Sequence, residues 1–302
     1  MNEIIQQIIN ATSGWSIEIT PKVASKINSF RNKLPPKTTV NVTFLPGEDP
    51  METVKVAERL NNDGMNAVPH ISARSLVDQK QLDNLLYEFV TRASVDEVLV
   101  IGGGVSKPLG EFPDSMSILR TGLLQKYNIS KVGVAGHPEG SPDINVVKLE
   151  SALQAKNDFS LKEGIDLYIE TQFCFDPTTV LNWEKNLRNN GINIPIRIGI
   201  PGPASIKTLF KFAKLVGIGN SMWFLTKQAH KISKLLTIQS PDNLLSGLSA
   251  GMASDPDCLI ENFHFYPFGG FLKTVEYADS IVTGNFSIRS NGEFEMNEGL
   301  AE

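Results

Sequence analysis

The runs EVLVI at residues 97–101 and KVGVA at residues 131–135 decide the fold class of this chain. Each run is short, nearly continuously apolar and rich in β-branched residues, which is typical of strands buried on both faces of a parallel sheet. Six further runs have a similar character, and amphipathic stretches separate them. We therefore expect eight strands, at residues 16–19, 38–43, 66–70, 97–101, 131–135, 167–172, 196–199 and 262–266.

Eight strands that alternate with helices predict an α/β chain folded as a single (β/α)8 TIM barrel. Asp49-Pro50 and Asp176-Pro177 each combine an N-cap Asp with Pro at the first helical position, so each begins a helix. Extra helices are expected between strands 7 and 8, in the apolar stretches 203–219, 221–238 and 241–254. We expect one domain over residues 1–302, with an N-terminal extension at residues 1–14 and a polar, frayed tail at about residues 284–302.

Composition excludes several classes of partner. The 302 residues are 41% hydrophobic and carry a net charge of −5 without a Lys/Arg-rich run, which argues against nucleic acid. No stretch approaches the ~18 apolar residues of a membrane span, and the start of the chain lacks the basic region of a signal peptide. Two cysteines make no disulfide framework, which favours a reducing, cytoplasmic location. The four histidines lack metal-ligand spacing, so no metal is expected. A homo-oligomer is compatible with the sequence, which does not decide the oligomeric state.

Glu18 is the first candidate for chemistry, because the active sites of barrel enzymes lie at the carboxyl ends of the strands. It stands between two isoleucines in the first predicted strand. A closed barrel has no edge, so this carboxylate must point inward or be paired. Burial there would raise its pKa and favour work as a general acid.

Other polar residues and glycines end the remaining strands. His70 is equally compatible with a ligand contact and a structural role, and Gln172 offers an uncharged amide that suits a heterocycle such as a pterin. The run Gly102–Gly104 does not have the spacing of a dinucleotide or phosphate loop. It is either a tight turn or a place where a flat ligand approaches the backbone. His264 alternates with phenylalanines and is expected to support its strand.

The chain resembles the methylenetetrahydrofolate reductase family from about Trp15 to Tyr277. The strings that carry the resemblance occur in family order at the predicted strands: SIEITPK, VNVTFLPG, AVPHIS, VGVAGHPEGSP, TQFCFD, IPIRIGIPGP and FHFYPF. Members of this family are (β/α)8 barrels that bind FAD. NAD(P)H reduces the flavin, which passes a hydride to 5,10-methylenetetrahydrofolate to give 5-methyltetrahydrofolate. The resemblance implies the same oxidoreductase function in one-carbon metabolism and methionine biosynthesis, with a tetrahydrofolate derivative as substrate.

The resemblance also implies roles for individual residues. Glu18 matches the family acid that assists opening of the imidazolidine ring at N10 to give the reactive iminium. Gln172 matches the glutamine that holds the pterin, and Phe175 lies on the same folate side. The cofactor side is assigned to Thr43, His70, Gly102, Gly103, Gly104, Ala135, His137 and Ser141.

Departures from the family pattern gather on the cofactor side. The family usually shows Leu-Arg-Gly-Asp after the fourth strand, whereas this chain has Ile101 followed by three glycines. The FAD-binding positions of the helix after the fifth strand fall near Leu153, Lys156, Phe159 and Ser160. FAD's diphosphate needs cations or aimed N–H donors. Three alternatives stay open: FAD bound through other residues, direct use of NAD(P)H, or a folate-binding barrel without reductase activity that serves methyl transfer or demethylation.

Overall fold

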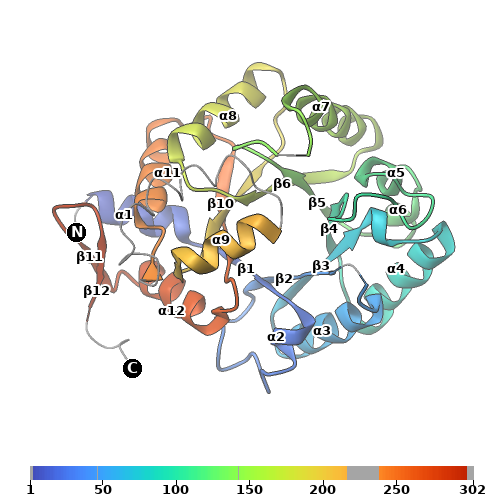
Figure 1. The fold of residues 1–302 in the computed structure, drawn as a ribbon, viewed down its shortest axis with the longest axis horizontal. Helices are drawn as coiled ribbons and strands as arrows, with labels where there is room; N and C mark the ends of the chain where they lie inside the picture. Colours follow the sequence, from blue (N-terminus) through green and yellow to red (C-terminus); the bar gives the residue numbers. More distant parts are fainter. Residues whose placement is uncertain (1–2, 46, 142, 216–237, 298–302) are drawn as a thin grey trace. The chain divides into compact units, whose positions relative to one another are not determined.

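The computed structural model describes residues 3–45, 47–141, 143–215 and 238–297 (Figure 1). The barrel strands are β1 (Ser16–Ile19), β2 (Thr39–Val42), β3 (Asn66–Ser72), β4 (Glu97–Ile101), β5 (Lys131–Gly136), β6 (Asp166–Phe173), β7 (Ile196–Pro201) and β10 (Ile260–Tyr266). They form a closed barrel in the order β1-β10-β7-β6-β5-β4-β3-β2. The predicted (β/α)8 fold is confirmed, and every predicted strand end lies within two residues of the observed one.

The helices follow the strands in alternation. They are α1 (Glu3–Thr12), α2 (Pro21–Ala24), α3 (Pro50–Asn62), α4 (Gln79–Ala93), α5 (Ser115–Leu119), α6 (Leu123–Lys126), α7 (Val146–Glu163), α8 (Pro177–Asn189), α9 (Ile206–Leu215), α11 (Asp242–Ser254), α12 (Phe271–Val282) and the 3-10 helix η1 (Ala73–Ser75). None of these described helices has both the length and the apolar character needed to cross a bilayer.

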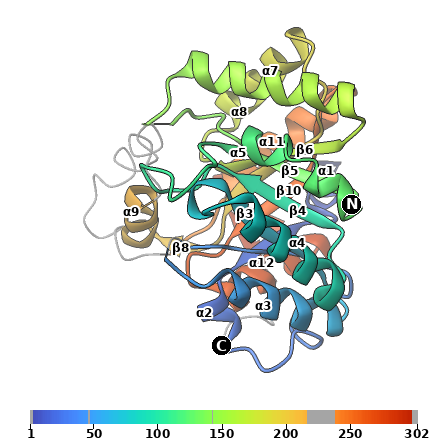
Figure 2. The same ribbon diagram turned by 90° about the vertical axis from the view of Figure 1, so that its right-hand side faces the viewer.

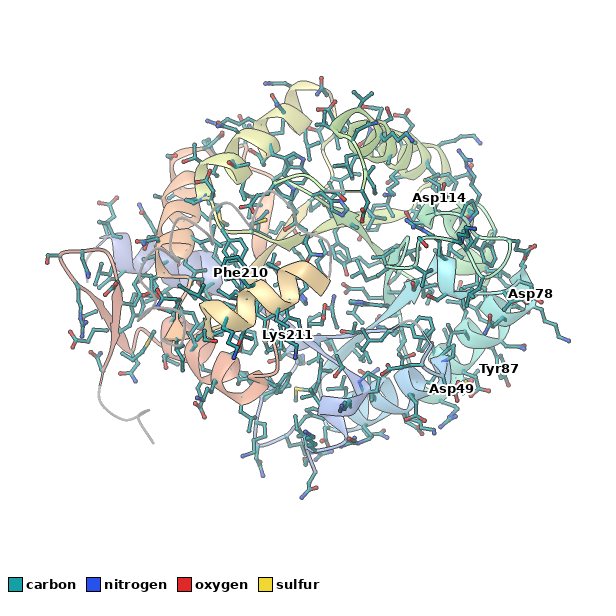
Figure 3. All side chains as sticks on the ribbon, in the orientation of Figure 1. Asp49, Asp78, Tyr87, Asp114, Phe210 and Lys211 are labelled. Carbon is teal, nitrogen blue, oxygen red and sulfur yellow. The ribbon has the colours of Figure 1, made fainter. Side chains whose placement is uncertain are left out.

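Aspartates start several helices. Asp49, Asp78 and Asp114 precede α3, α4 and α5, and each carboxylate accepts a hydrogen bond from a backbone N–H two or three residues further on (Figure 3). Asp176 does the same for α8, so both predicted helix starts are confirmed. An N-cap carboxylate satisfies a backbone donor that the helix itself leaves open, which is typically worth about 1 kcal/mol.

The chain divides into two compact units, which we call the N-terminal and C-terminal units. The N-terminal unit comprises Ser16–Ala135 and Lys156–Ile169. In it, β1 to β5 pair in parallel and in sequence order. Helices α3 and α4 lie side by side (Figure 2). Their inner faces are fully buried at helical spacing, as Leu82, Leu86 and Phe89 of α4 show.

The C-terminal unit comprises Met1–Trp15, Gly136–Ala155 and Glu170–Glu302. Here β10 pairs with β7, and α1 packs against α11 and α12, so the predicted N-terminal extension is a helix. Two of the three extra helices expected between strands 7 and 8 are present, as α9 and α11. Residues 221–237 of the third stretch lie outside the described residues. Two residues on either side of this region form a small antiparallel sheet, β8 (Ala204–Ser205) with β9 (Ile238–Gln239).

The segment after residue 284 differs from the frayed tail that its polar composition predicted. It forms an antiparallel hairpin of β11 (Phe286–Ile288) and β12 (Phe294–Met296). The rings of Phe286 and Phe294 lie 4.9 Å apart. Asp242 of α11 accepts hydrogen bonds from the Phe294 N–H at 2.9 Å and from the Tyr277 hydroxyl at 2.6 Å. Two phenylalanines and one buried aspartate therefore order a segment whose average composition is polar.

Candidate active site

Glu18 lies in the middle of β1, where parallel pairing sets it opposite Asn41 of β2. The Thr43 N–H donates to the Ile19 carbonyl at 2.9 Å, which continues the pairing beyond the end of β2. Side chains two residues apart on a strand share a face, so Thr43 and Asn41 lie on the face that carries Glu18. Asn41 is fully buried, whereas Glu18 keeps some contact with solvent.

The surroundings of Glu18 change its acidity. Desolvation raises the pKa of Glu18 from 4.5 to about 7, and the Thr43 side chain offsets a smaller part of that rise. The low local polarity disfavours the charged form, as the sequence predicted. The carboxyl group is therefore partly protonated near neutral pH. Because it also reaches solvent, it can give up a proton and be reprotonated.

His70 lies near the end of β3, opposite Leu99 of β4, and is 5% exposed. Burial lowers its pKa to about 3, so the imidazole is neutral at physiological pH. Its Nε2 atom is buried and has no hydrogen-bond partner among the residues that the structure describes. A buried polar atom without a protein partner is costly. The ring is thus suited to contact a ligand.

The three glycines after β4 make room for side chains of the protein itself. A Cβ atom at Gly102 would lie 3.1 Å from Nη2 of Arg74, and one at Gly103 would lie 2.1 Å from the Ser72 hydroxyl. Gly103 also has a φ of +90°, which L-residues rarely adopt. Only Gly104 has open space around it. Arg74 and Ser72 therefore fill the space over the first two glycines. The sequence predicted either a tight turn or a ligand close to the backbone, and it did not predict these two side chains.

The remaining cofactor-side candidates of the N-terminal unit lie at β5 and α7. Ala135 is half-buried near the end of β5. Lys156 is buried, and desolvation lowers its pKa to about 8, against a smaller opposing effect of Asp114. The Ser160 hydroxyl donates to the Ile165 carbonyl at 2.7 Å, so it closes the end of α7.

In the C-terminal unit, Gln172 stands near the end of β6 and is half-buried. Its Oε1 accepts a hydrogen bond from the Phe173 N–H at 3.1 Å. A glutamine side chain has one acceptor oxygen and two N–H donors. With the oxygen engaged, the amide nitrogen is the group left to donate to a ligand.

An aromatic cluster surrounds the segment that follows Gln172. The rings of Tyr266 and Phe268 lie 5.5 Å and 4.9 Å from that of Phe173. Phe210 of α9 packs against the same cluster, whereas its neighbour Lys211 is exposed (Figure 3). Phe175 belongs to the cluster and is 8% exposed. Aromatic rings bury large area in well-defined geometry, so the cluster can form an apolar wall for a flat ligand.

The loop after β5 holds the β6–α8 connection through Glu139. One carboxylate oxygen of Glu139 accepts from the N–H groups of Phe175 and Asp176, at 2.6 and 2.8 Å. His137 and Ser141 are half-buried on the same loop. The sequence singled out His137 and Ser141 but not Glu139. Its Pro-Glu-Gly setting was the available signal, because a carboxylate in a rigid loop often caps backbone donors.

A buried acid–base pair involves Glu170, two residues before Gln172 in β6. Oε2 of Glu170 and Nδ1 of His264 are 3.6 Å apart, and both side chains are fully enclosed. The His264 ring meets Tyr266 edge-on, and the Tyr266 hydroxyl donates to the Thr171 carbonyl at 3.0 Å. His264 is thus buried in its strand as expected, while Glu170 was missed although it is a carboxylate inside an apolar run.

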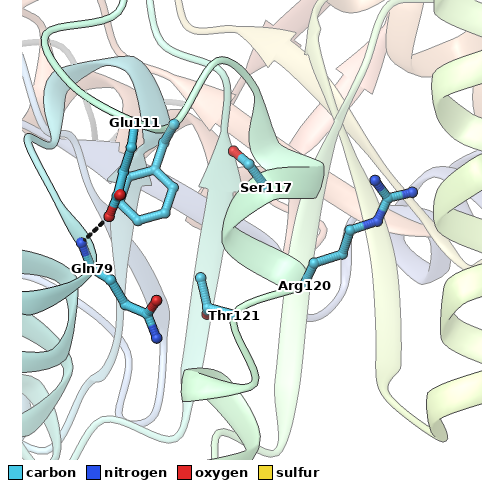
Figure 4. A pocket seen from close by; sticks show the side chains of 6 residues that line it. Gln79, Glu111, Ser117, Arg120 and Thr121 are labelled. Carbon is cyan, nitrogen blue, oxygen red and sulfur yellow. Dashed lines mark hydrogen bonds between the residues drawn. The ribbon is translucent and has the colours of Figure 1, made fainter.

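A separate pocket of about 280 Å³ lies near the starts of α4 and α5 (Figure 4). Its lining residues are Gln79, Glu111, Phe112, Ser117, Arg120 and Thr121. The Gln79 N–H donates to the Glu111 carboxylate across it. None of the candidate residues lines this pocket, so it is not the candidate site. In the described part of the chain, no cluster of His, Cys, Asp or Glu could hold a metal ion.

A closed parallel barrel whose strands carry an acid, an imidazole and an amide defines a TIM-barrel protein with an enzyme-like set of side chains. The sequence profile of the methylenetetrahydrofolate reductase family matches residues 19–234, well over half of the chain. The chain therefore belongs to the methylenetetrahydrofolate reductase family.

Two individual proteins illustrate the relationship. Methylenetetrahydrofolate reductase 1 of Schizosaccharomyces pombe (strain 972 / ATCC 24843) is 38% identical over 88 residues. That match spans 29% of this chain and only 14% of the yeast protein. A solved structure from Clostridium thermocellum, described as binding two copies of 5-methyl-5,6,7,8-tetrahydrofolic acid, has a TM-score of 0.56 and is 14% identical. It covers 92% of this chain and 98% of its own, which shows a shared fold.

Proposed function

We propose that this protein interconverts 5,10-methylenetetrahydrofolate and 5-methyltetrahydrofolate by hydride transfer from or to NAD(P)H. The observation that carries the proposal is the pKa of the Glu18 carboxyl group, which is raised to about 7. The barrel that holds this group belongs to the methylenetetrahydrofolate reductase family. Catalytic acids need a pKa near the working pH, and desolvation is a common way to reach it.

Glu18 serves as the proton donor in the reductive direction. Its carboxyl group protonates N10 as the bond between N10 and the methylene carbon breaks, and the resulting iminium at N5 accepts a hydride. One proton and one hydride thus convert the methylene group into a methyl group, while NAD(P)H becomes NAD(P)⁺. The partial exposure of Glu18 allows solvent to return its proton. In the oxidative direction the same carboxylate removes the proton from N10.

Gln172 and Phe175 are proposed to bind the folate. The Gln172 amide nitrogen is available as a donor because its oxygen is engaged by the Phe173 N–H. Phe175 contributes to the aromatic cluster beside it. An amide donor next to an apolar aromatic surface suits a pterin, which is flat and has hydrogen-bonding edges.

The cofactor side fits a flavin through His70. Its buried Nε2 has no partner in the described part of the chain, and its neutral ring can contact an uncharged isoalloxazine. Thr43, Gly104, Ala135, His137 and Ser141 are proposed as further cofactor contacts. A bound flavin would supply a relay for the hydride between NAD(P)H and the folate. Whether this chain holds one is tested by the visible absorbance of the purified protein.

The test of the acid is Glu18→Gln, which keeps the shape of the side chain and removes its proton. We expect turnover to fall at least 100-fold with the fold intact, since general acid catalysis contributes about 10²–10⁴-fold. NAD(P)H oxidation in the presence of methylenetetrahydrofolate measures it, and circular dichroism checks the fold. Glu163→Gln, on the exposed end of α7, is the matched control. Near wild-type turnover by Glu18→Gln would contradict the role of Glu18 as the general acid.

A second candidate function is folate binding without reductase activity, in support of tetrahydrofolate-dependent methyl transfer or demethylation. The loop after β4 favours it, because three glycines stand where the family usually has an Arg and an Asp. It predicts binding of 5-methyltetrahydrofolate by calorimetry together with no folate-dependent NAD(P)H oxidation, with or without added FAD. Observed oxidation eliminates this alternative.

A further inference from the structure

We propose that Arg74 is a ligand-binding residue, which receives an oxyanion of the substrate or cofactor beside the glycines that follow β4. The inference deepens the proposed function, because the choice of ligands rests on it. Arg74 comes from η1, directly after β3, and not from the β4 loop where the family usually carries its arginine.

The backbone of Arg74 is fixed on both sides. Its N–H donates to the Gly102 carbonyl at 3.0 Å, and its own carbonyl accepts from the Leu109 N–H at 2.9 Å. The guanidinium group lies over Gly102, where Nη2 is 3.1 Å from the position that a Cβ atom would take. A side chain at residue 102 would therefore compete with the guanidinium for this space. The absence of a side chain at Gly102 thus allows the Arg74 guanidinium to take its observed position.

The charge of Arg74 is not compensated within the described residues. A guanidinium has five N–H donors. One of them, on Nη1, donates to the Val105 carbonyl at 2.8 Å. The Nε atom is buried and has no protein partner, and the described part of the chain gives Arg74 no ion pair with a carboxylate. A partly buried cation without a counter-charge is costly, so an anionic ligand would be stabilised there.

The chemistry of the guanidinium selects the kind of ligand group. Its planar fork matches two oxygens of a phosphate or a carboxylate. Ser72, which lies over Gly103, adds a hydroxyl that is 3.2 Å from that of Ser75. The backbone at Gly104 is open to a ligand. The oxyanion can come from the diphosphate of a dinucleotide or from the glutamate carboxylates of the folate.

The experiment compares charged ligands with neutral analogues in wild-type protein and in Arg74→Gln. One arm measures FAD against riboflavin, and NADH against dihydronicotinamide riboside. The other measures 5-methyltetrahydrofolate against its glutamate-free pteroate analogue. We expect Arg74→Gln to weaken the charged member of one arm about 10- to 100-fold, the loss of one or two charge-assisted hydrogen bonds. The neutral member should bind as before, and Arg74→Lys should fall between the two.

The control is Arg92→Gln, which removes an arginine that already pairs with Glu58 and Glu88 on the surface. It should leave every affinity unchanged. A selective loss in the dinucleotide arm or in the folate arm identifies the source of the oxyanion. Equal weakening of charged and neutral members would show a merely structural role and overturn the proposal. So would an unchanged affinity for every charged ligand, or no binding of any charged ligand by wild-type protein. Turnover judges the proposed function separately.

Discussion

At the scale of single residues, one physical effect shifts the pKa values of two side chains of the N-terminal unit in opposite directions. Desolvation raises the pKa of Glu18 to about 7 and lowers the pKa of His70 to about 3. In both cases burial disfavours the charged form. The result near neutral pH is a carboxyl group that can be protonated and an imidazole that stays neutral. Groups with such separated acidities are a common mark of catalytic sites.

The raised pKa of Glu18 predicts the pH dependence of turnover. In the reductive direction the carboxyl must hold a proton, so kcat should be highest below pH 7. It should then fall about tenfold for each pH unit well above the pKa of about 7. Steady-state NAD(P)H oxidation between pH 5.5 and 9 measures the profile, which Glu163→Gln should reproduce. A flat profile over this range would contradict the role of Glu18.

The same group links pH to stability. The pKa of Glu18 rises from 4.5 to about 7 on folding, so the folded protein binds its proton more tightly than the unfolded chain. The resulting stabilisation is complete below pH 4.5 and is lost as pH rises through 7. Glu18→Gln escapes this loss. At pH 8 its free energy of unfolding should exceed that of wild type by at most about 3 kcal/mol, with little difference at pH 4.5.

Urea unfolding at the two pH values measures this difference. Glu163→Gln on the surface should track wild type at both. If Glu18→Gln were less stable than wild type at pH 8, the result would contradict a Glu18 pKa raised by desolvation.

At the scale of elements, the backbones of β6 and β7 lie close together at Gly199. A Cβ atom there would lie 2.6 Å from the Thr171 carbonyl and 2.8 Å from the backbone of Gln172. These are backbone atoms, which cannot move aside like the tip of a side chain. Glycine at this point therefore lets β6 present Gln172 in its observed position.

Gly199→Ala should consequently lower stability by about 1–3 kcal/mol, the usual cost of overpacking. It should also weaken binding of 5-methyltetrahydrofolate, because the backbone that carries Gln172 must shift. Calorimetry and urea unfolding measure the two effects. Gly251→Ala, whose new methyl group would lie nearest to side-chain atoms of Leu181 on α8 and not to backbone, is the control for binding. Unchanged folate affinity in Gly199→Ala would contradict the proposal that Gln172 binds the folate.

The C-terminal hairpin makes a prediction of its own. Tyr277→Phe removes the buried hydrogen bond to Asp242, which also holds β12. Stability should drop by about 1–3 kcal/mol, since the carboxylate loses a buried donor. Thermal unfolding measures the drop, and turnover per folded molecule should not change. Tyr87→Phe on the exposed face of α4 is the matched control (Figure 3). Equal stability of the two variants would remove Asp242 as the anchor of the hairpin.

The elements also show what sequence reasoning can reach. The eight strands were predictable because burial on both faces leaves an apolar pattern within each run. The partial burial of Glu18 followed from its place inside such a run. The contact of Arg74 with Gly102 was not predictable, because it depends on how the ends of β3 and β4 meet. The hydrogen bonds of Glu139 were not predictable either, because its partners lie far away in the sequence, on the loop after β6. The hairpin at β11 was hidden by its polar composition.

At the scale of the whole molecule, the chain is a member of the methylenetetrahydrofolate reductase family folded as a closed (β/α)8 barrel. Each compact unit carries its own group of candidate residues. The N-terminal unit holds the acid Glu18, the neutral His70 and the cation Arg74. The C-terminal unit holds Gln172 with its aromatic cluster. The loop after β4 carries three glycines in place of the family's Arg and Asp.

The most direct test of the reductase proposal is folate-dependent oxidation of NAD(P)H by the purified protein. It is assayed with and without added FAD, and the folate product is identified by mass. The proposal predicts oxidation that requires 5,10-methylenetetrahydrofolate, formation of 5-methyltetrahydrofolate in equal amount, and loss of both with Glu18→Gln. Protein that binds 5-methyltetrahydrofolate but oxidises neither NADH nor NADPH under any of these conditions would contradict it.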